Sequence, residues 1–465
     1  MSDTALELAR AALSGSRCWV VGGAVRDELM GAPAGTDLDL VVAGEAAPAA
    51  RALARATGAV AFSLSDEFGA WRVVARSHEW QADINPLRGE SVEDDLRLRD
   101  FTINAIARPL AGGAAIDPLG GEADLRARVL RLAAPGALAA DPLRALRLVR
   151  LVCELRLEAD AEAREAAREA AGGLASVASE RVYAELCRVL VSERPAEGLR
   201  LALELGLCAV VLPELEALRG IEQSRYHHLD ALDHTLEALE RAVELERDPG
   251  AVLGAQHDEA LRALLRDPLA NELTRGEALR FAVLFHDIAK PQTRAERDDG
   301  RVGFPGHDEL GAQVASEILA RLRAAGQIGA YVATLTRNHL RLGFLVHSAP
   351  LGRRELYDYL DACDPAPVDV TLLSVADRLA TRGDGSAEAI ERHLELARAL
   401  IGEALAWQRS GGPAALIRGD QLARALEITP GPALGELLEA IAREAFAGEL
   451  RDADQAIAFA AQRMA

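Results

Sequence analysis

The fold of the N-terminal part of this chain is decided by two neighbouring segments, WVVGGAVRD at residues 19–27 and TDLDLVV at residues 36–42. The first is typical of a buried strand that ends in a glycine turn and opens a helix. The second is typical of a strand that begins with two carboxylates. Side chains i and i+2 of a strand point to the same side, so Asp37 and Asp39 project together. Their charges repel unless a cation lies between them, and hard divalent cations prefer carboxylate oxygens.

The glycine turn indicates that the metal would be bound together with a phosphate group. Gly22 and Gly23 let backbone N–H groups approach a phosphate at the start of a helix. The turn and the two carboxylates together predict a site for a metal-bound nucleoside triphosphate. A solvated strand edge explains most isolated Asp-x-Asp pairs, so this prediction depends on the glycine turn just upstream.

The composition is that of an ordinary folded protein. Of the 465 residues, 50% are hydrophobic and 27% are charged, and we expect two to four domains. Five scattered cysteines without a Cys-x-x-Cys motif predict reduced thiols. No apolar run reaches the roughly 18 residues of a membrane span, and the first residues do not have the basic start of a signal peptide. These features predict a cytoplasmic protein with no membrane partner.

The charge distribution limits how the chain meets nucleic acid. Its net charge of −20 argues against broad, nonspecific affinity for nucleic acid. Between residues 125 and 156, however, arginines far outnumber acidic residues. These arginines are either phosphate contacts or the solvated faces of helices, and the composition leaves both interpretations open.

The remaining pattern of the first half predicts alternating helices and strands. We expect helices over residues 1–16 and 45–57, and strands over 60–64, 70–75 and 80–85. Asp83 in the last strand is a candidate third carboxylate, because a two-metal phosphoryl-transfer site needs a ligand beyond one pair. An ordinary aspartate at the end of a strand is the alternative. From residue 138 to about 220 the spacing of apolar residues is helical, and residues 240–272 look like an exposed, charged excursion.

Four further motifs carry a family resemblance. They are RDFTINA at 99–105, DPLGG at 117–121, DPLRALR at 141–147 and SERV at 179–182. In this order they resemble the motifs of the class II (bacterial-type) tRNA nucleotidyltransferase and poly(A) polymerase family. The resemblance implies an α+β chain. Its head would have the polymerase-beta-like nucleotidyltransferase fold, a mixed sheet with helices, and a mostly α-helical body would follow.

The resemblance also implies roles for individual residues. Nucleotide-binding positions would be Gly22, Gly23 and Arg26 for the triphosphate, Arg99, Asp100 and Asn104 for the ribose, and Asp141, Arg144 and Arg147 in the base-choosing motif. Asp37 and Asp39 would be catalytic and hold Mg²⁺, and Asp83 would be a third catalytic carboxylate. An RNA 3′-hydroxyl would then attack the α-phosphate of CTP or ATP.

The residues of the base-choosing motif also have a direct physical interpretation. Asp141 and Arg144 are three apart, which predicts one face of a helix. A carboxylate beside a guanidinium presents acceptors and donors that can read the Watson–Crick edge of a base. The alternative is a surface ion pair, which contributes little.

Two positions depart from the family pattern. Ala140 stands where the family has glutamate. The connection between the strand of Asp83 and the RDFTINA motif is short, spanning residues 86–93. In this family a shortened connection is associated with enzymes that add only the two cytidines, so CC addition is an open alternative to CCA addition.

A second site follows in the histidine-rich part of the chain. His286-Asp287 closes an apolar helix, and such a buried polar pair is costly unless it is satisfied. This part resembles an HD-domain metallophosphohydrolase, which implies a metal set of His234, His286, Asp287 and Asp377. His307 and His339 lie where some HD proteins bind a second metal, and surface helix histidines are the alternative. Imidazole and carboxylate ligands suit a divalent transition metal.

The predicted organisation is a head (residues 1–137), a helical neck (138–220), an HD domain (221–385) and a helical RNA-binding tail (386–465). The predicted function is template-independent addition of CCA or CC to tRNA from CTP and ATP, with HD phosphohydrolase activity as a second function. The rivals are a polymerase that adds A to RNA, and an HD phosphohydrolase whose head only binds nucleotide or RNA. The oligomeric state stays open.

Overall fold

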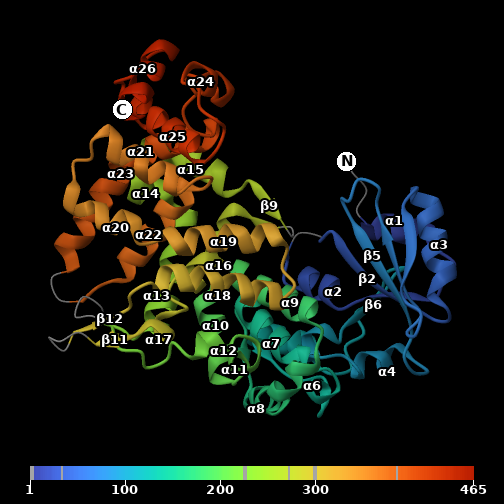
Figure 1. Ribbon diagram of the computed structural model, residues 1–465. Coiled ribbons are helices and arrows are strands. Elements are labelled where there is room, and N and C mark those ends of the chain that lie inside the picture. The colour runs from blue at the N-terminus through green and yellow to red at the C-terminus, as the bar shows by residue number, and fades with distance from the viewer. Residues whose placement is uncertain are drawn as a thin grey trace. The chain divides into compact units, whose positions relative to one another are not determined.

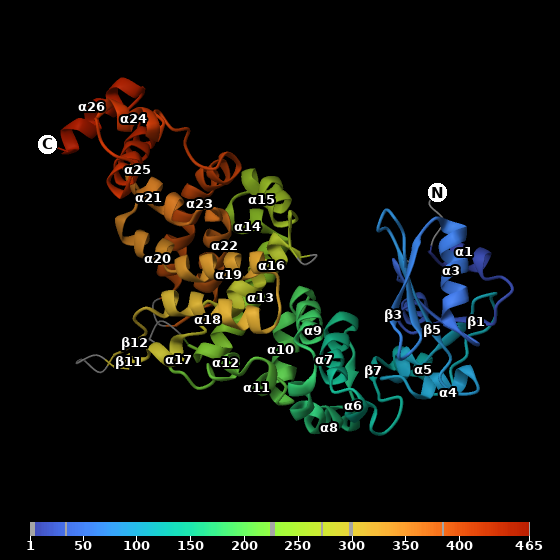
Figure 2. The same ribbon diagram turned by 45° about the vertical axis from the view of Figure 1, so that its right-hand side comes forward.

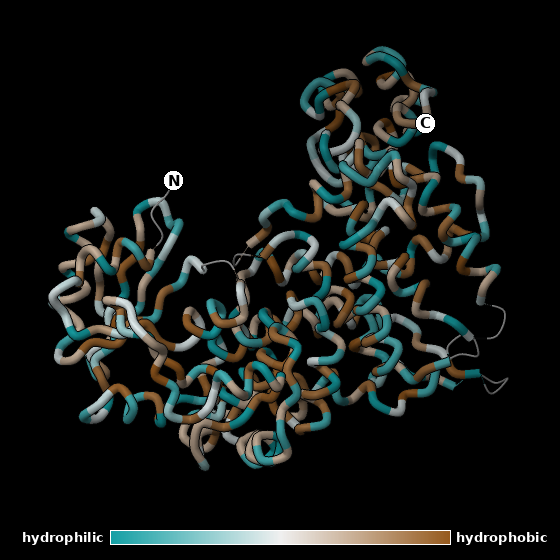
Figure 3. The backbone as a smooth tube through the Cα atoms, turned by 180° about the vertical axis from the view of Figure 1, so that it is seen from behind, coloured by the Kyte–Doolittle hydropathy of each residue, from teal (hydrophilic) through white to brown (hydrophobic). Residues whose placement is uncertain are grey.

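The computed structural model describes residues 5–32, 35–223, 228–270, 273–296, 301–383 and 386–464. Two compact units form, one from residues 1–192 and 200–211 and the other from residues 193–199 and 212–465. Along the helices of both units, apolar and polar segments alternate (Figure 3). Within the described ranges, no helix combines the length and apolarity that crossing a membrane requires.

A six-stranded mixed sheet forms the head of the first unit (Figure 1). Its strand order is β3-β4-β5-β2-β1-β6, and β2 and β5 pair in parallel while the other neighbours are antiparallel. The strands are β1 (Cys18–Val21), β2 (Asp37–Val42), β3 (Val60–Ser65), β4 (Ala70–Val74), β5 (Gln81–Pro86) and β6 (Ala107–Pro109). The helices of the head are α1 (Ala5–Ala12), α2 (Gly23–Leu29), α3 (Ala46–Thr57), α4 (Val92–Arg97) and α5 (Gly121–Ala127), with the 3₁₀ turn η1 (Thr102–Asn104).

Strand alternation in β2 separates the core of the head from its reactive face. Leu38 and Leu40 point into the main core, which α1 and α3 cover, and Figure 1 shows α3 along that side of the sheet. Helix α3 supplies a buried stripe at residues 46, 49, 50 and 53, the spacing of an amphipathic helix. Asp37 and Asp39 alternate with these leucines and therefore project from the opposite face.

The rest of the first unit is helical. It contains α6 (Ala137–Ala140), α7 (Leu143–Leu155), α8 (Ala161–Ala170), α9 (Ser179–Val191) and α11 (Cys208–Val211), with the short strands β7 (Val129–Leu130) and β8 (Glu158–Ala159). Helix α10 (Pro195–Glu204) contributes to both units. Helices α7 and α9 pack against each other, and this packing brings the two C-terminal motifs of the family resemblance together.

The second unit is built around α16 (Arg275–Phe285), in which every residue from Ala278 to Phe285 is buried. A helix that is buried on all sides lies at the centre of its domain. It packs against α13 (Ala231–Arg247), α19 (Gly326–Asn338) and α22 (Pro367–Ala380). Figure 2 shows α18 (His307–Arg321) beside α19.

Further elements complete this unit. They are α12 (Pro213–Glu216), α14 (Pro249–Leu253), α15 (Asp258–Leu265), α17 (Lys290–Thr293), α20 (Arg341–Leu345), α21 (Arg353–Ala362) and α23 (Ser386–Ser410), with β9 (Pro268–Ala270), β10 (Leu273–Thr274), β11 (Ala295–Glu296) and β12 (Val302–Gly303). Helices α24 (Gly419–Ala425), α25 (Pro432–Ala447) and α26 (Ala453–Met464) enclose a small core of their own. The predicted fold class, an α+β head followed by a mostly helical body, is confirmed.

The predicted exposed excursion at residues 240–272 is wrong. Helix α13 continues to Arg247, and α14 and α15 bury Leu253, Leu261 and Leu265. The many charges of this segment lie on the outer faces of amphipathic helices, because its few leucines recur at helical spacing.

A buried aspartate joins four helices of the second unit. Asp369 in α22 is fully buried and accepts hydrogen bonds from Arg275 Nε (3.2 Å), Tyr331 Oη (2.7 Å) and Gln408 Nε2 (3.0 Å). We expect Asp369→Ala to lower the free energy of unfolding by about 3–5 kcal/mol, because it leaves the largely buried Arg275 charge without this carboxylate and removes the acceptor of Tyr331 and Gln408. Denaturant unfolding followed by circular dichroism measures this loss.

The matched control is Asp358→Ala. Asp358 forms an equally close two-bond pair with Arg443, at 2.6 and 2.7 Å, but both side chains are exposed. We expect this change to cost no more than about 1 kcal/mol. Equal losses in the two variants would contradict the structural role of Asp369.

Candidate functional site

Three carboxylates of the head share one face of the sheet. Asp39 on β2 is the register partner of Asp83 on β5, and Asp37 lies two residues before Asp39. The pKa of Asp39 is raised because surrounding protein desolvates its carboxylate and because Asp83 and Asp37 add negative charge, while Arg99 acts in the opposite direction. A divalent cation would relieve this repulsion, so Asp37 and Asp39 fit the metal that the sequence predicts.

Asp83 has a partner that the sequence did not indicate. Arg72 on β4 donates to both of its oxygens, from Nε at 2.6 Å and from Nη2 at 2.8 Å. The compact metal-ligating groups found among the described residues include none of Asp37, Asp39 and Asp83. Asp83 would therefore have to exchange Arg72 for a metal, and its role as a third ligand stays a prediction. The contact with Arg72 depends on the pairing of β4 with β5, which no local pattern reveals.

Gly22 lies against two of the predicted site residues. Its φ is +69°, and an added Cβ would lie 3.1 Å from Arg99 Nη1 and 3.5 Å from Asp39 Oδ2. Both the left-handed backbone and this close approach require glycine here. The turn therefore brings Gly22, Asp39 and Arg99 into one place, as expected for a site that combines a phosphate cradle with a metal.

A chain of hydrogen bonds connects other predicted nucleotide-binding residues. Arg26 Nη1 donates to Asn104 Oδ1 (2.8 Å), and Asn104 Nδ2 donates to Asp100 Oδ1 (3.0 Å). Arg147 then donates from Nη1 to Asp100 Oδ2 (3.0 Å) and from Nε to Glu185 Oε1 (3.2 Å). The network thus runs from the helix after the glycine turn to α7 and α9, and it holds the site residues in fixed orientations. Glu185 lies on α9 just after the SERV motif, and its part in the network depends on the packing of α7 on α9.

Two residues of this network, Asp100 and Arg147, are held in their charged forms. Burial alone would raise the pKa of Asp100, but Arg147 and Asn104 outweigh burial and lower it. Burial opposes the charge of Arg147, yet Asp100 and Glu185 raise its pKa overall. Asp100 and Arg147 therefore stay ionised around neutral pH and join the segment just before η1 to α7.

The prediction that Asp141 and Arg144 share a helix face is wrong. Asp141 has extended backbone angles (φ −145°, ψ 98°) and precedes α7, because the residue before a proline, here Pro142, disfavours helical geometry. Its Oδ1 accepts from the Leu143 N–H (3.2 Å), and its Oδ2 accepts from Arg181 Nη2 (2.9 Å).

Arg144 lies in the first turn of α7 and donates to two backbone carbonyl oxygens. Its Nη1 binds Ala137 O at 3.0 Å and its Nη2 binds Leu98 O at 3.4 Å. Asp141 and Arg144 remain neighbours across the start of α7, since the Arg144 N–H donates to Asp141 O (3.0 Å). Each side chain is held by a different partner.

The short connection between β5 and α4 is firmly anchored. Arg88 Nε donates to Asp95 Oδ1 at 2.9 Å, and Asp95, which is buried, also accepts from Arg99 Nη2 at 3.2 Å. Ser91 and Asp94 form a capping box at the start of α4. The connection is therefore tied through Asp95 to Arg99 in the candidate nucleotide site.

Three buried histidines of the second unit are oriented in the same way. Each donates its Nδ1–H to the carbonyl oxygen three residues earlier, since a carbonyl can only accept. The pairs are His286 with Val283 (2.8 Å), His307 with Phe304 (2.7 Å) and His339 with Thr336 (2.6 Å). This orientation turns Nε2, the atom that would bind a metal, away from the carbonyl and toward the cluster.

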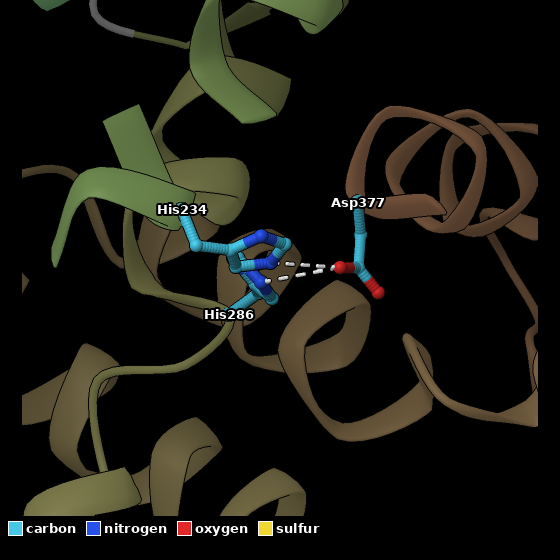
Figure 4. Close-up of side chains that lie close together, drawn as sticks. All are labelled: His234, His286 and Asp377. Carbon is cyan, nitrogen blue, oxygen red and sulfur yellow. Dashed lines mark hydrogen bonds and ion pairs between the residues drawn. The ribbon is translucent and has the colours of Figure 1, made fainter. Parts of the chain in front are cut away.

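The structure brings together all six residues predicted for the HD site. His234 Nε2 lies 3.0 Å from Asp377 Oδ1, and His286 Nε2 lies 3.9 Å from the same oxygen (Figure 4). These three residues form one group that could hold a metal, and Asp287, His307 and His339 form a second.

The donor chemistry of these groups fits a cation. Two ring nitrogens of the cluster, His286 Nε2 and His307 Nε2, are buried. Neither has a hydrogen-bond partner of good geometry in the described part of the chain. Both face carboxylate oxygens of Asp287, at 3.2 and 3.4 Å. Burial alone would raise the pKa of Asp287, but His286 and Lys290 lower it well below its ordinary value. Burial would lower the pKa of His286, but Asp287 raises it overall, so a divalent metal bound here would take the place of a proton on His286.

The fold and the two sites define a nucleotidyltransferase head joined to a helical unit with an HD-type metal site. Family models match the chain as "Poly A polymerase head domain" at residues 18–131, "Probable RNA and SrmB- binding site of polymerase A" at 157–218, and "HD domain" at 231–382.

Individual proteins agree with these matches. The A-adding tRNA nucleotidyltransferase of Deinococcus radiodurans is 38% identical over 95% of this chain and 94% of that protein. The CC-adding tRNA nucleotidyltransferase of Thermus thermophilus is 35% identical over 94% of this chain and 92% of that protein. A solved CCA-adding enzyme in its apo form I has the same fold, with a TM-score of 0.64 and 19% identity, over 97% of this chain and 92% of that one.

The chain belongs to the bacterial-type tRNA nucleotidyltransferase and poly(A) polymerase family, and it is a nucleotidyltransferase. Its head and its HD domain are both domain types that depend on divalent metals.

Proposed function

We propose that the head adds nucleotides to the 3′ end of tRNA without a template, using CTP or ATP and Mg²⁺. The observation that carries this proposal is the convergence of Asp37 and Asp39 with Gly22 and Arg99 on one face of the sheet. Both curated relatives described above act on tRNA by their names.

In this proposal the chain's residues place the reactants. The glycine turn and Arg26 hold the triphosphate, and Arg99 faces the ribose and phosphates from beside Asp39. Asp100 and Asn104 have their polar atoms engaged with each other and with Arg147 and Arg26, so they position the site. A divalent cation at Asp37 and Asp39 supplies activation of the hydroxyl and neutralises charge on the leaving group.

The reaction follows from this placement. The RNA 3′-oxygen loses its proton and forms a bond to the α-phosphorus. The bond between the α-phosphorus and the bridging oxygen breaks, and pyrophosphate leaves. The proton passes to a carboxylate or to solvent. The negative charges of Asp37 and Asp39 alone would oppose its loss, and the divalent cation that they would hold would supply the positive charge that favours it.

The short connection favours CC addition as the form of this activity. The residues from Arg88 to Ser91 are held by Asp95 and Asp94, which leaves no long segment between β5 and α4 that could rearrange between nucleotides. A-addition is the second candidate, because the Deinococcus relative is an A-adding enzyme.

Two tRNA substrates separate these forms, one that lacks CCA and one that ends in CC. Each is incubated with Mg²⁺ and CTP, ATP or both, and the 3′ ends are sequenced. We expect two cytidines on the first tRNA and no addition to the second. Addition of adenosine to the CC-ending tRNA, with no addition to the tRNA that lacks CCA, would establish A-addition instead. A complete CCA end would contradict the argument from the short connection, and no addition would contradict the proposed function.

We also propose that the HD site is a metallophosphohydrolase site loaded with a divalent transition metal. The observation that favours it is the cluster of six ligands from five segments of the second unit. A metal held there supplies Lewis-acid activation of water against a phosphate ester. We place the enzyme in the cytoplasm, a location that the five free cysteines support.

A further inference from the structure

Asp141, the proposed base-selecting carboxylate, is held from two sides. Its Oδ1 accepts from the Leu143 N–H at 3.2 Å, in the first turn of α7. Its Oδ2 accepts from Arg181 Nη2 at 2.9 Å, in the first turn of α9. Because each oxygen has its own donor, the plane of the carboxylate is fixed relative to both helices.

This clamp leaves room for a base. An ionised carboxylate has about four lone-pair positions, and these two donors occupy only one on each oxygen. Cytosine and adenine carry amino groups, N4 and N6, where uracil and guanine carry carbonyl oxygens. An oriented carboxylate oxygen therefore accepts from CTP or ATP and repels the carbonyl oxygen of UTP or GTP. Discrimination depends on the direction of the remaining lone pair.

We propose that Arg181 is a positioning residue that fixes the orientation of Asp141 and thereby sharpens selection of CTP and ATP over UTP and GTP. This inference rests on the proposed nucleotide addition. Without Arg181, the carboxylate turns about its own bond while the Leu143 N–H still holds one oxygen. A carboxylate that turns freely loses conformational entropy when it binds a base, and this loss weakens binding.

The chain contains a matched comparison for this role. Arg188 lies two turns further along α9 and donates to Glu154 near the end of α7, from Nε at 2.8 Å and from Nη2 at 3.0 Å. The side chains of Arg181 and Arg188 are 53% and 55% exposed. Both ion pairs therefore join α9 to the region of α7 in a similar setting. A merely structural role predicts similar effects from losing either one.

The test compares wild type, Arg181→Ala, Arg181→Lys and Arg188→Ala, all as full-length chains. The readouts are kcat and KM for CTP, ATP, UTP and GTP on a tRNA that accepts nucleotides, and the temperature of unfolding. We expect Arg181→Ala to lose about five- to tenfold in discrimination against UTP and GTP, mainly through a raised KM for the correct nucleotide. Arg181→Lys restores part of the loss, since lysine keeps one donor and the charge.

We expect Arg188→Ala to retain wild-type discrimination while shifting the unfolding temperature as little as Arg181→Ala does. Unchanged discrimination in Arg181→Ala would overturn the proposal, and so would equal losses in the Arg181 and Arg188 variants. If the wild-type chain itself adds no nucleotide to any tRNA, the proposed function fails, and this result is distinct from failure of the Arg181 proposal.

Discussion

Replacing Asp37 and Asp39 together by alanine should reduce nucleotide addition by at least about a thousandfold while HD-site activity is retained. The two carboxylates are the proposed ligands of the divalent cation, which contributes several kcal/mol to the transition state, and each 1.36 kcal/mol is a factor of ten in rate. The rate of tRNA extension at saturating nucleotide and Mg²⁺ measures this loss.

The double variant should stay folded. Asp37 and Asp39 project from the face of the sheet opposite the main core, which contains Leu38 and Leu40. Removing them also removes repulsion with Asp83, which raises the pKa of Asp39 in the wild type. We therefore expect an unfolding temperature at or slightly above that of the wild type.

An acidic pair elsewhere on the same sheet provides the control. Asp66 and Glu67 lie exposed in the turn between β3 and β4. Replacing both by alanine removes the same charge as the double aspartate variant, and we expect unchanged addition. Addition that survives loss of Asp37 and Asp39 would show that the metal site of the head is assigned to the wrong residues.

Much of the head follows from local patterns in the sequence. The alternation of Leu38 and Leu40 with Asp37 and Asp39 predicts a strand with one buried and one reactive face. The spacing of alanines and Leu53 predicts α3. These patterns are reliable because the spacing of apolar residues depends on which side of a strand or helix packs against the core. The order of the strands is not local, so the pairing of Asp83 with Arg72 could not be predicted.

The start of α7 shows how a neighbouring residue overrides simple spacing. Positions 141 and 144 are three apart, which suggested one helix face. Pro142 disfavours helical geometry at Asp141, so that residue lies outside the helix and its carboxylate accepts the Leu143 N–H. The proline is visible in the sequence and could have corrected the prediction. The partner of Asp141, Arg181, is forty residues away and became identifiable only from the packing of α9 on α7.

The HD cluster shows the opposite case, in which a family resemblance predicted a group that spacing could not. Its residues come from α13, the end of α16, α18, the end of α19 and α22, between positions 234 and 377. A buried polar pair is costly unless it is satisfied, so His286-Asp287 at the end of an apolar helix indicated a site, and the resemblance to HD domains implied its other members. The structure brings His307 and His339 to this cluster, where the alternative was a surface position.

Asp287→Asn should remove metal from the HD site and abolish phosphate-ester hydrolysis there. Oδ1 of Asp287 faces His307, and its Oδ2 faces His286 and accepts from Lys290 Nζ at 2.6 Å. Asparagine keeps an oxygen for Lys290, the only lysine of the chain, but it removes the negative charge that two adjacent metal groups share. Metal bound per chain after purification measures the first effect, and hydrolysis of bis(p-nitrophenyl) phosphate measures the second.

A second variant guards against a loss caused by unfolding. Burial lowers the pKa of His339 to about 4, so this histidine is neutral at pH 7 and His339→Gln changes no charge. We expect it to reduce bound metal as well, while His347→Ala, an exposed histidine of the same unit, leaves metal content unchanged. Nucleotide addition should persist in all three variants, because their residues belong to the second unit and the carboxylates of addition belong to the first. Wild-type metal content in both Asp287→Asn and His339→Gln would mean that the cluster is held together by its own hydrogen bonds and ion pairs, and the phosphohydrolase proposal would fall while the proposal for the head remained.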